Sequence, residues 1–317
     1  PDHQADWGMR ILSSQDPKYN PGGYHYGTVW PLFTGWASIG EYRYHRPLPA
    51  YSNLRANALL ALNGSLGHVA EVLSGDYFQT LATGTPHQIW SAAMVVNPLL
   101  SGLLGLQVDA GDCQLNFAPH VPADWSSFSV NNVHLGAMVL NLNYQRTPDS
   151  IRLEVQPTST GHCSMRFSPA ASLRARITGV RLNGRALPFH IEANSSDQHV
   201  TVNVPIVSGE STVEIQMKNN FELGETSTLP ELGGTSRGLR VLSESWSPKR
   251  DTLTLLLSGM AGQSYELSAW NPDQISSVQG ADLDKKTGTE AKVHVQIPAS
   301  PPRSDPRATV VFHFAAR

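Results

Sequence analysis

The apolar periodicity of this chain changes once, near residue 106, and that change most constrains its fold. From residue 107 to residue 217, apolar and polar residues alternate with period two, as in strands with one buried face. Asn183-Gly184, between two such runs, is a two-residue hairpin signal. About eight short strands at close spacing predict an antiparallel β-sandwich. The clearest runs are residues 113–117, 138–144, 151–155, 200–204 and 212–217.

A polar segment at residues 218–237, with many Gly, Ser and Thr residues, has the composition of a linker. Alternation resumes after it, for example at residues 252–257 and 309–314. Residues 238–317 are therefore predicted to form a second, smaller β-sandwich domain.

Residues 1–106 differ because aromatic residues concentrate there and the apolar spacing is helical. They hold four of the seven Trp and seven of the nine Tyr residues. One set of apolar residues recurs at steps of three and four, which predicts a helix with a single buried stripe. That set is Val29, Leu32, Phe33, Trp36 and Ile39.

Further helices are predicted for residues 50–63 and 86–104, the second of them kinked at Pro98. Long loops at residues 13–28 and 66–85 separate the helices. Loops of this length in a compact domain usually carry function.

The charge and residue counts exclude several classes of protein. A formal net charge of −3 without a basic run argues against nucleic acid or an anionic membrane as partner, and suits a neutral substrate such as a sugar. The sequence contains no stretch of about 18 apolar residues, so it predicts no membrane-spanning helix. The histidines are scattered singly, so we predict no metal and no cofactor. Cys113 and Cys163 allow either one disulfide bridge or two buried thiols.

The chain begins Pro-Asp-His-Gln-Ala-Asp-Trp, without an initiator Met or a signal peptide. We therefore expect a fragment or a processed product of a longer precursor. Under that expectation the missing signal says nothing about export, and a periplasmic or secreted location stays open.

The loops of residues 1–106 hold the side chains that glycoside hydrolysis needs. That reaction uses two carboxyl groups, one to protonate the leaving oxygen and one to activate water or attack the sugar. Sugar subsites also need aromatic faces and polar groups. Glu71 lies among apolar neighbours, where a carboxylate must be paired, neutralised or functional. Residues 24–31 and 85–91 supply Tyr, His, Gln and Trp and lead directly into predicted helices.

Four segments occur in an order that resembles a known family. They are residues 6–13, with Trp7-Gly8-Met9-Arg10; 24–31, with Tyr-His-Tyr-Gly-Thr-Val-Trp-Pro; 70–75, with Ala-Glu-Val-Leu-Ser-Gly; and 86–91, with Pro-His-Gln-Ile-Trp-Ser. The order is similar to the last third of the (α/α)6 barrel in glycogen-debranching-type glucosidases (the amylo-α-1,6-glucosidase group) and related bacterial glycosidases. Ala70, Val72 and His87 depart from the family pattern, which leaves the substrate and the subgroup open.

The resemblance implies a fold class and a function. The fold class is multidomain α plus β, with the C-terminal portion of a helical barrel at residues 1–106 and two β-sandwich domains after it. The function is an inverting, exo-acting, α-glucosidase-like hydrolase of oligo- or polysaccharides. The family's general acid is an Asp that lies earlier in the barrel, so it would come from a missing N-terminal part, in cis or as a partner chain. The chain alone would then be inactive.

The resemblance also implies roles for individual residues. Glu71 would be the general base, and six residues would bind substrate: Tyr24, His25, Trp30, Gln88, Trp90 and Arg10. Each has a structural alternative, such as helix capping for Gln88, core packing for the two Trp residues and a salt bridge for Arg10. Asp6 and Asp76 are weaker candidates for a second carboxylate.

Two rival functions follow from the same residues. The chain could be a non-catalytic carbohydrate-binding or structural piece, since most of it is predicted sandwich. Trp246 and Trp270 could then form a sugar-binding face, although Trp in a sandwich is more often buried. Phosphorolysis ranks low because the sequence has no glycine-rich phosphate loop and no basic cluster.

Overall fold

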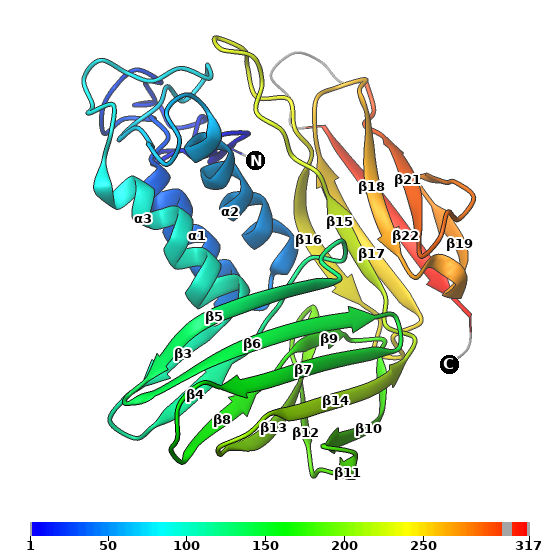
Figure 1. The fold of residues 1–317 in the computed structure, drawn as a ribbon. Helices are drawn as coiled ribbons and strands as arrows, with labels where there is room; N and C mark the ends of the chain where they lie inside the picture. The colour runs from blue at the N-terminus through cyan, green and yellow to red at the C-terminus, as the bar shows by residue number, and fades with distance from the viewer. Residues whose placement is uncertain (1, 300–305, 316–317) are drawn as a thin grey trace.

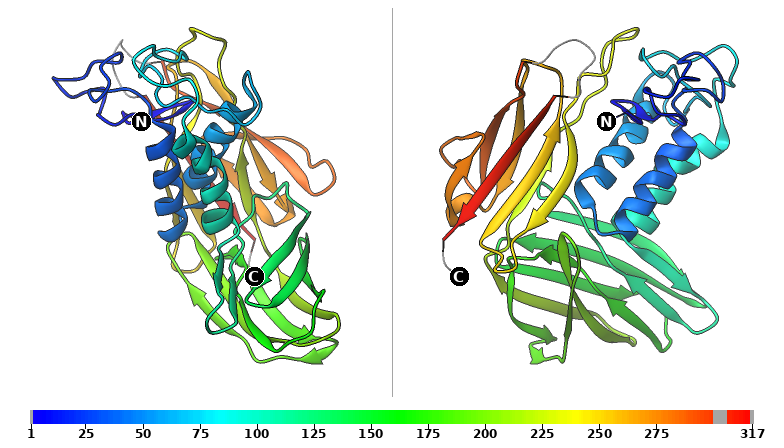
Figure 2. Two further views of the ribbon diagram at one scale, coloured as in Figure 1. Left: turned by 60° about the vertical axis from the view of Figure 1, so that its left-hand side comes forward. Right: turned by 180° about the vertical axis from the view of Figure 1, so that it is seen from behind.

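The computed structural model describes residues 2–299 and 306–315, which form a small helical layer and two groups of β-strands. The helices lie beside the second group of strands, and both stand on the first group (Figure 1; Figure 2). The helices are α1 (Pro31–Arg43), α2 (Pro47–Leu62) and α3 (Ile89–Asn97), the π-helix η1 (Pro98–Leu103) and the short 3-10 helix η2 (Pro272–Gln274).

The three predicted helices are confirmed, and proline marks their starts and breaks. Pro31 and Pro47 occupy the first turns of α1 and α2, where a missing N–H costs nothing. Pro98 ends α3, because it has no N–H for the carbonyl of Met94. The buried side chain of Asn57 donates to that carbonyl at 3.0 Å and to the Pro31 carbonyl at 2.9 Å. One amide of α2 therefore binds the three helices together.

The first group of strands consists of two sheets that enclose one apolar core. One sheet has the order β11-β10-β14-β7-β6-β5 and the other the order β12-β13-β8-β4-β3, with β9 paired to β13. Alternate residues of the long strands are buried, as in Met138–Thr147. The strands are β3 (Leu106–Asp109), β4 (Gln114–Phe117), β5 (Ser127–Leu135), β6 (Met138–Thr147), β7 (Ser150–Pro157), β8 (Cys163–Phe167), β9 (Ala170–Ser172), β10 (Arg176–Leu182), β11 (Arg185–Ala186), β12 (His190–Ala193), β13 (Asp197–Ile206) and β14 (Ser211–Lys218).

The second group of strands also has two sheets and its own core, with orders β15-β18-β21-β20 and β16-β17-β22-β19. Strand β15 lies within the segment predicted to be a linker, and it pairs with β18. The strands are β15 (Glu222–Glu225), β16 (Arg240–Trp246), β17 (Thr252–Ser258), β18 (Ser264–Trp270), β19 (Ile275–Gln279), β20 (Asp282–Leu283), β21 (Glu290–Gln296) and β22 (Arg307–Phe314). A hairpin of β1 (Gln4–Ala5) and β2 (Gly8–Met9) precedes the helices.

Helix α2 joins the three parts. Its residues Ala50 and Leu54 belong to the core of the first strand group, together with Tyr42 of α1. Leu48 packs against the core of the second strand group. The helical layer thus packs on the β structure through α2, while Trp36 of α1 and Ile89 and Val96 of α3 remain exposed.

The predicted fold class is therefore wrong, and so is the resemblance to the debranching-type barrel. The described residues are mostly β, with five sheets and three α-helices, and no portion of an (α/α)6 barrel is present among them. Sequence periodicity located the helices correctly, but a barrel requires helices that pack on one another in rings. Here three helices pack on one another as a small layer, α2 also contacts β15 and β16, and loops fill most of the remaining sequence before residue 89, so no ring of helices forms among the described residues.

The described residues contain no helix that is both long and apolar enough to cross a membrane.

Cys113 and Cys163 form a disulfide bond, so the first of the two alternatives left by the sequence is confirmed. The residues stand where parallel strands β4 and β8 begin, beside the register pair Gln114 and Ser164. Their Cα atoms are 5.0 Å apart and the bond closes a loop with a sequence separation of 50 residues. Such bonds form in oxidising compartments.

Removal of this bond is expected to destabilise the chain. Because the bridge restricts the unfolded chain, Cys113→Ser with Cys163→Ser should lower the free energy of unfolding by about 2–4 kcal/mol. Urea denaturation of the double variant and of the oxidised and reduced wild type measures this. An unchanged midpoint after full reduction of the wild type would contradict the expectation.

Candidate active site

The Glu71 carboxylate is held by three hydrogen bonds. The Tyr24 hydroxyl donates to Oε1, the Thr85 amide donates to Oε2 at 2.9 Å, and the Thr85 hydroxyl donates to Oε2 at 3.3 Å. The Tyr24 bond is the main cause that lowers the pKa of Glu71, and the same bond raises the pKa of Tyr24. Glu71 is only 7% exposed, yet it stays ionised at neutral pH.

Short extended segments of the long loops position Glu71. Its amide donates to the Thr85 carbonyl at 2.9 Å, while Leu73 forms bridges with Val29 and Thr80. Gly84 passes close by, because a Cβ there would lie 2.7 Å from the Val72 side chain and 3.4 Å from the Glu71 carboxylate. Only glycine allows this close approach. The loops are therefore packed structures that fix one carboxylate.

Three of the predicted site residues lie next to Glu71 as an aromatic cluster. The Tyr24 ring meets the rings of His25 and Trp30 edge-on, at centroid distances of 4.7 Å and 4.8 Å. The His25 ring stacks on Trp30 at 5.5 Å. Trp30 is only 5% exposed, and its Nε1 donates to the Thr28 hydroxyl at 2.9 Å. Trp30 therefore supports the cluster from behind, whereas His25 is exposed and faces solvent.

The other predicted site residues are Trp90, Gln88 and Arg10, and Gln88 also donates to the Thr85 hydroxyl at 3.3 Å, beside Glu71. Trp90, in the first turn of α3, is 41% exposed. Gln88 caps α3, because its side-chain oxygen accepts from the amide of Ile89 at 3.0 Å. Arg10 donates to the carbonyls of Gly75 and Gln4, each at 2.7 Å. Arg10 thus braces backbone segments and makes no salt bridge to Glu71.

The weaker carboxylate candidates are engaged elsewhere. Asp6 is buried and forms an ion pair with Arg240. Asp76 accepts a hydrogen bond of 2.6 Å from the Tyr19 hydroxyl. Neither of them forms a hydrogen bond with Glu71 among the described residues, and their role as a second carboxyl stays a prediction.

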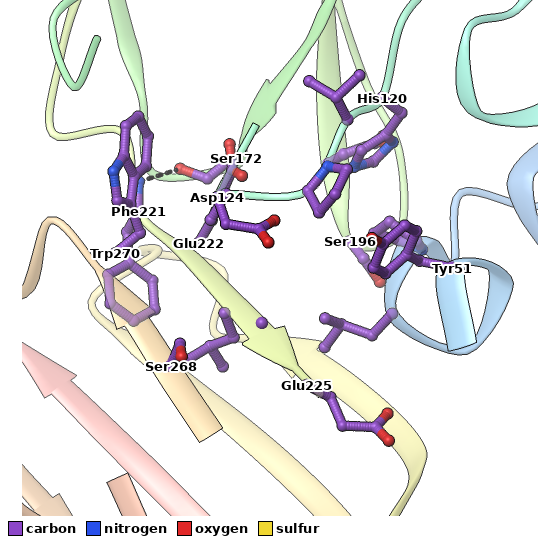
Figure 3. A pocket seen from close by; sticks show the side chains of 18 of the residues that line it. Tyr51, His120, Asp124, Ser172, Ser196, Phe221, Glu222, Glu225, Ser268 and Trp270 are labelled. Carbon is purple, nitrogen blue, oxygen red and sulfur yellow. Dashed lines mark hydrogen bonds and ion pairs between the residues drawn. The ribbon is translucent and has the colours of Figure 1, made fainter. Parts of the chain in front are cut away.

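A cavity of about 320 Å³ lies between the helical layer and the two strand groups, and Glu71 is not among the residues that line it. Helix α2, strand β9 of the first group and strands β15 and β18 of the second group form its walls (Figure 3). Trp270 is buried beside it, with the Arg146 guanidinium 4.5 Å from its ring centroid. Trp246 stacks on Phe314 at 5.4 Å. Both tryptophans line this cavity. The sequence did not predict a cavity at this place.

Two carboxyl groups of the cavity have raised pKa values. Burial raises the pKa of Glu225 and of Glu244 to about 7. Glu222 instead forms an ion pair with the buried Arg146 at 2.6 Å. These residues lie in strands of the second group, and a Glu within an alternating strand looks like an ordinary solvent-facing residue in sequence. Only the packing of one strand group on another buries them.

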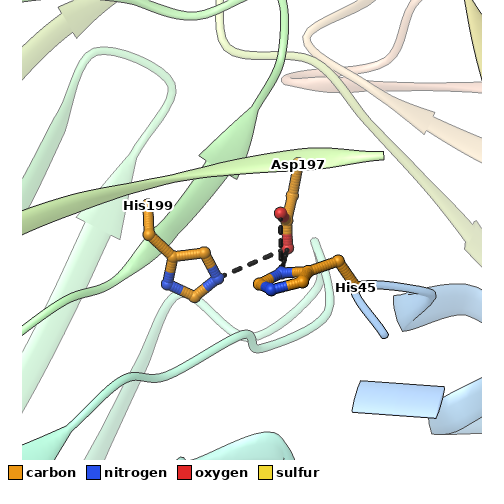
Figure 4. Close-up of side chains that lie close together, drawn as sticks. All are labelled: His45, Asp197 and His199. Carbon is orange, nitrogen blue, oxygen red and sulfur yellow. Dashed lines mark hydrogen bonds and ion pairs between the residues drawn. The ribbon is translucent and has the colours of Figure 1, made fainter. Parts of the chain in front are cut away.

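A third group of titratable residues surrounds Asp197 (Figure 4). His45 Nδ1 lies 2.9 Å from Oδ1, and His120 Nδ1 lies 3.0 Å from Oδ2. His199 Nε2 lies 3.4 Å from Oδ2. The ligand atoms of His45, Asp197 and His199 lie within 4.8 Å of one another and could hold a metal ion. His45 and Asp197 are 152 residues apart, so sequence spacing gave no sign of this group.

Comparison with known proteins gives similarities to solved structures alone. No protein-family model matches the chain, and no curated protein matches it. An α-L-rhamnosidase from Dictyoglumus thermophilum is similar over 59% of this chain and 21% of its own, with 12% identity and a TM-score of 0.40.

Two further solved structures cover more of the chain. A protein titled glycoside hydrolase is similar over 90% of this chain and 51% of its own, with 14% identity and a TM-score of 0.35. A GH127 β-L-arabinofuranosidase from Geobacillus stearothermophilus T6 is similar over 90% and 50%, with 9% identity and a TM-score of 0.30. The chain thus spans between a fifth and about half of the solved chains it matches.

Proposed function

We propose that the chain contributes to a glycoside hydrolase in which Glu71 is the general base. The observation that carries this proposal is the set of hydrogen bonds from Tyr24 and Thr85, which keeps the carboxylate ionised beside exposed aromatic rings. An ionised carboxylate can take a proton from water as that water attacks the anomeric carbon.

The proposed reaction is an inverting hydrolysis at the end of a sugar chain. Inversion needs a second carboxyl group about 6.5–9.5 Å from the first, with the attacking water between the base and the sugar. Asp6 and Asp76 are engaged by Arg240 and Tyr19, so we assign the acid to a segment of the same polypeptide outside these loops or to a partner chain. Proton NMR of the first-formed product would show the inverted anomer.

Sugar binding is assigned to the aromatic side chains around Glu71. His25, on the loop that leads into α1, and Trp90, in the first turn of α3, expose their rings. Sugar rings present apolar faces that stack on such rings. Because the Tyr24 hydroxyl contacts the carboxylate, we expect it to orient the base, and its ring shares the aromatic cluster with His25.

The test is Glu71→Gln in the full polypeptide, which removes the negative charge and keeps the shape of the side chain. Turnover of oligosaccharides should fall by about a thousandfold, as expected when a general base is lost. Glu210→Gln is the matched control, because Glu210 is exposed and lies between β13 and β14. Release of reducing sugar measures both variants. Normal turnover by a folded Glu71→Gln protein would refute the assignment.

A second candidate function is carbohydrate binding without hydrolysis. The exposed rings of Trp36 and Trp90, at 52% and 41% exposure, favour it. Under this function, Trp90→Ala should weaken oligosaccharide binding while Glu71→Gln leaves it unchanged, and the wild type should release no reducing sugar. Titration calorimetry and the hydrolysis assay together distinguish the two functions.

A further inference from the structure

We propose that His45, Asp197 and His199 bind one divalent transition-metal ion of the zinc class. The three residues come from two distant parts of the chain (Figure 4). His45 lies in the turn between α1 and α2, while Asp197 and His199 lie on β13 of the first strand group. The backbone of His45 has a φ of 57°, a left-handed conformation that non-glycine residues adopt at a cost.

The hydrogen bonding of His199 points to a cation. Its Nδ1 lies 2.7 Å from the carbonyl oxygen of Ser168, an acceptor, so Nδ1 carries the hydrogen. In the neutral ring, Nε2 therefore presents a lone pair towards the Asp197 carboxylate at 3.4 Å. Two electron-rich atoms that face each other need a positive charge between them. An imidazole that donates its other N–H to a carbonyl is also the usual arrangement of a metal-bound His.

The distance between His199 and Asp197 fits a small ion. Tetrahedral zinc bonds of about 2.0–2.2 Å place neighbouring ligand atoms about 3.3–3.6 Å apart. His199 Nε2 is 3.4 Å from Asp197 Oδ2, and His45 Nδ1 is 2.9 Å from Oδ1. The 3.4 Å distance falls within the tetrahedral range, whereas the 2.9 Å distance is shorter, so His45 would move away from Asp197 when the ion enters.

The chemistry of the three ligands selects the class of ion. Two imidazole nitrogens and one carboxylate oxygen suit zinc and its neighbours, whereas Ca²⁺ and Mg²⁺ prefer oxygen ligands alone. Asp197 is 3% exposed in its side chain. Its carboxylate supplies the one negatively charged ligand of the group.

Neighbouring side chains hold the ligands in place. His120 Nδ1 lies 3.0 Å from Asp197 Oδ2, and the Asn194 amide donates to Oδ1 at 3.3 Å. The Ser195 hydroxyl donates to the backbone carbonyl of His45 at 3.5 Å. The ion would thus tie the turn between α1 and α2 to the first strand group, and a water would complete its coordination. Asp197 and His120 also line the cavity between α2 and strands β9, β15 and β18.

The experiment uses the full chain, freed of metal with a chelator and then titrated with Zn²⁺. Calorimetry should give one bound ion per chain. The melting temperature should rise by about 5 °C at a free Zn²⁺ concentration about 100-fold above Kd. His199→Gln and His45→Gln should each weaken binding by at least about 100-fold. His120→Gln should weaken it by about 10-fold, because His120 only positions Asp197.

The matched control is His294→Gln. His294 forms an exposed pair with Asp284 at 2.9 Å, outside the proposed site, so its loss should leave Zn²⁺ affinity unchanged. Co²⁺ as a spectroscopic probe should show the absorption of a tetrahedral site in the wild type and lose it in His45→Gln. The proposal is overturned if the folded, metal-free chain takes up no stoichiometric Zn²⁺, or if its affinity is the same in His45→Gln and His199→Gln. Either result would mean that His45, Asp197 and His199 are joined by hydrogen bonds alone and bind no metal ion.

Discussion

Replacement of Arg240 by Met should lower the free energy of unfolding by about 3–5 kcal/mol. Arg240 and Asp6 form a buried ion pair that joins the β1–β2 hairpin to strand β16. Without the guanidinium, the Asp6 charge would remain buried with only neutral partners. An unpaired buried charge is among the most damaging changes in a folded protein.

The surroundings of Asp6 explain why this pair should matter. Its carboxylate also accepts from the amides of Arg237 and Gly238, at 2.7 Å and 2.9 Å, and from the Ser236 hydroxyl at 2.9 Å. Burial raises the pKa of Asp6, but Arg240 and these donors outweigh it and lower the value. The neighbouring Trp7 donates to the carbonyl of Ser74 at 2.8 Å. The pair thereby anchors the segment that carries Glu71.

Urea denaturation measures the change, with Arg152→Met as the matched control. Arg152 pairs with Glu154 and Glu214 on the surface of the first strand group, at 3.0 Å and 2.9 Å. Exposed pairs contribute at most about 1 kcal/mol, so this variant should stay close to the wild type. Equal effects of the two substitutions would mean that the buried pair adds nothing beyond a surface pair.

Stability should also fall as the pH rises from about 4.5 to 7. Burial raises the folded-state pKa of Glu225 and Glu244 from 4.5 to about 7. Between these values the folded chain binds more protons than the unfolded chain, so each rise in pH favours unfolding. The stability that Glu225 and Glu244 contribute is fully present below their unfolded-state pKa of 4.5, and it is lost as the pH rises through their folded-state pKa of about 7. Each group should account for about 1–3 kcal/mol.

Asp6, Asp197 and His45 also affect how stability depends on pH. The lowered pKa values of Asp6 and Asp197 mean that their stabilisation is present above about pH 4 and is lost as the pH falls further. Asp197 mainly raises the pKa of His45, so that histidine loses its stabilisation as the pH rises, in the same sense as the two Glu residues. We therefore expect maximum stability between about pH 4 and 5.

Denaturation of the wild type at pH 4.5, 6 and 7.5 tests this expectation. Glu225→Gln combined with Glu244→Gln should reduce the slope, because Gln cannot ionise. The remaining slope comes from Glu41, whose pKa burial also raises to about 7, and from His45. Glu210→Gln, which changes an exposed carboxyl, should keep it. An unchanged slope in the double variant would show that the two cavity carboxyls do not cause the pH dependence.

The sequence alone predicted local structure well where a short stretch decides it. Helical spacing and Pro31 fixed the start of α1, and Pro98 marked the end of α3. Period-two alternation located strands such as Met138–Thr147, because one buried face imposes it. A carboxylate among apolar neighbours drew attention to Glu71, and its role as a base stays a prediction.

The tertiary structure decided everything that depends on distant residues. Helical spacing does not record what a helix packs against, so the predicted barrel was wrong and α2 covers strands instead. The raised pKa of Glu225 exists because two strand groups and a helix close over it. His45 meets Asp197 across 152 residues. Sequence determines which faces are apolar, and only packing determines which polar groups those faces enclose.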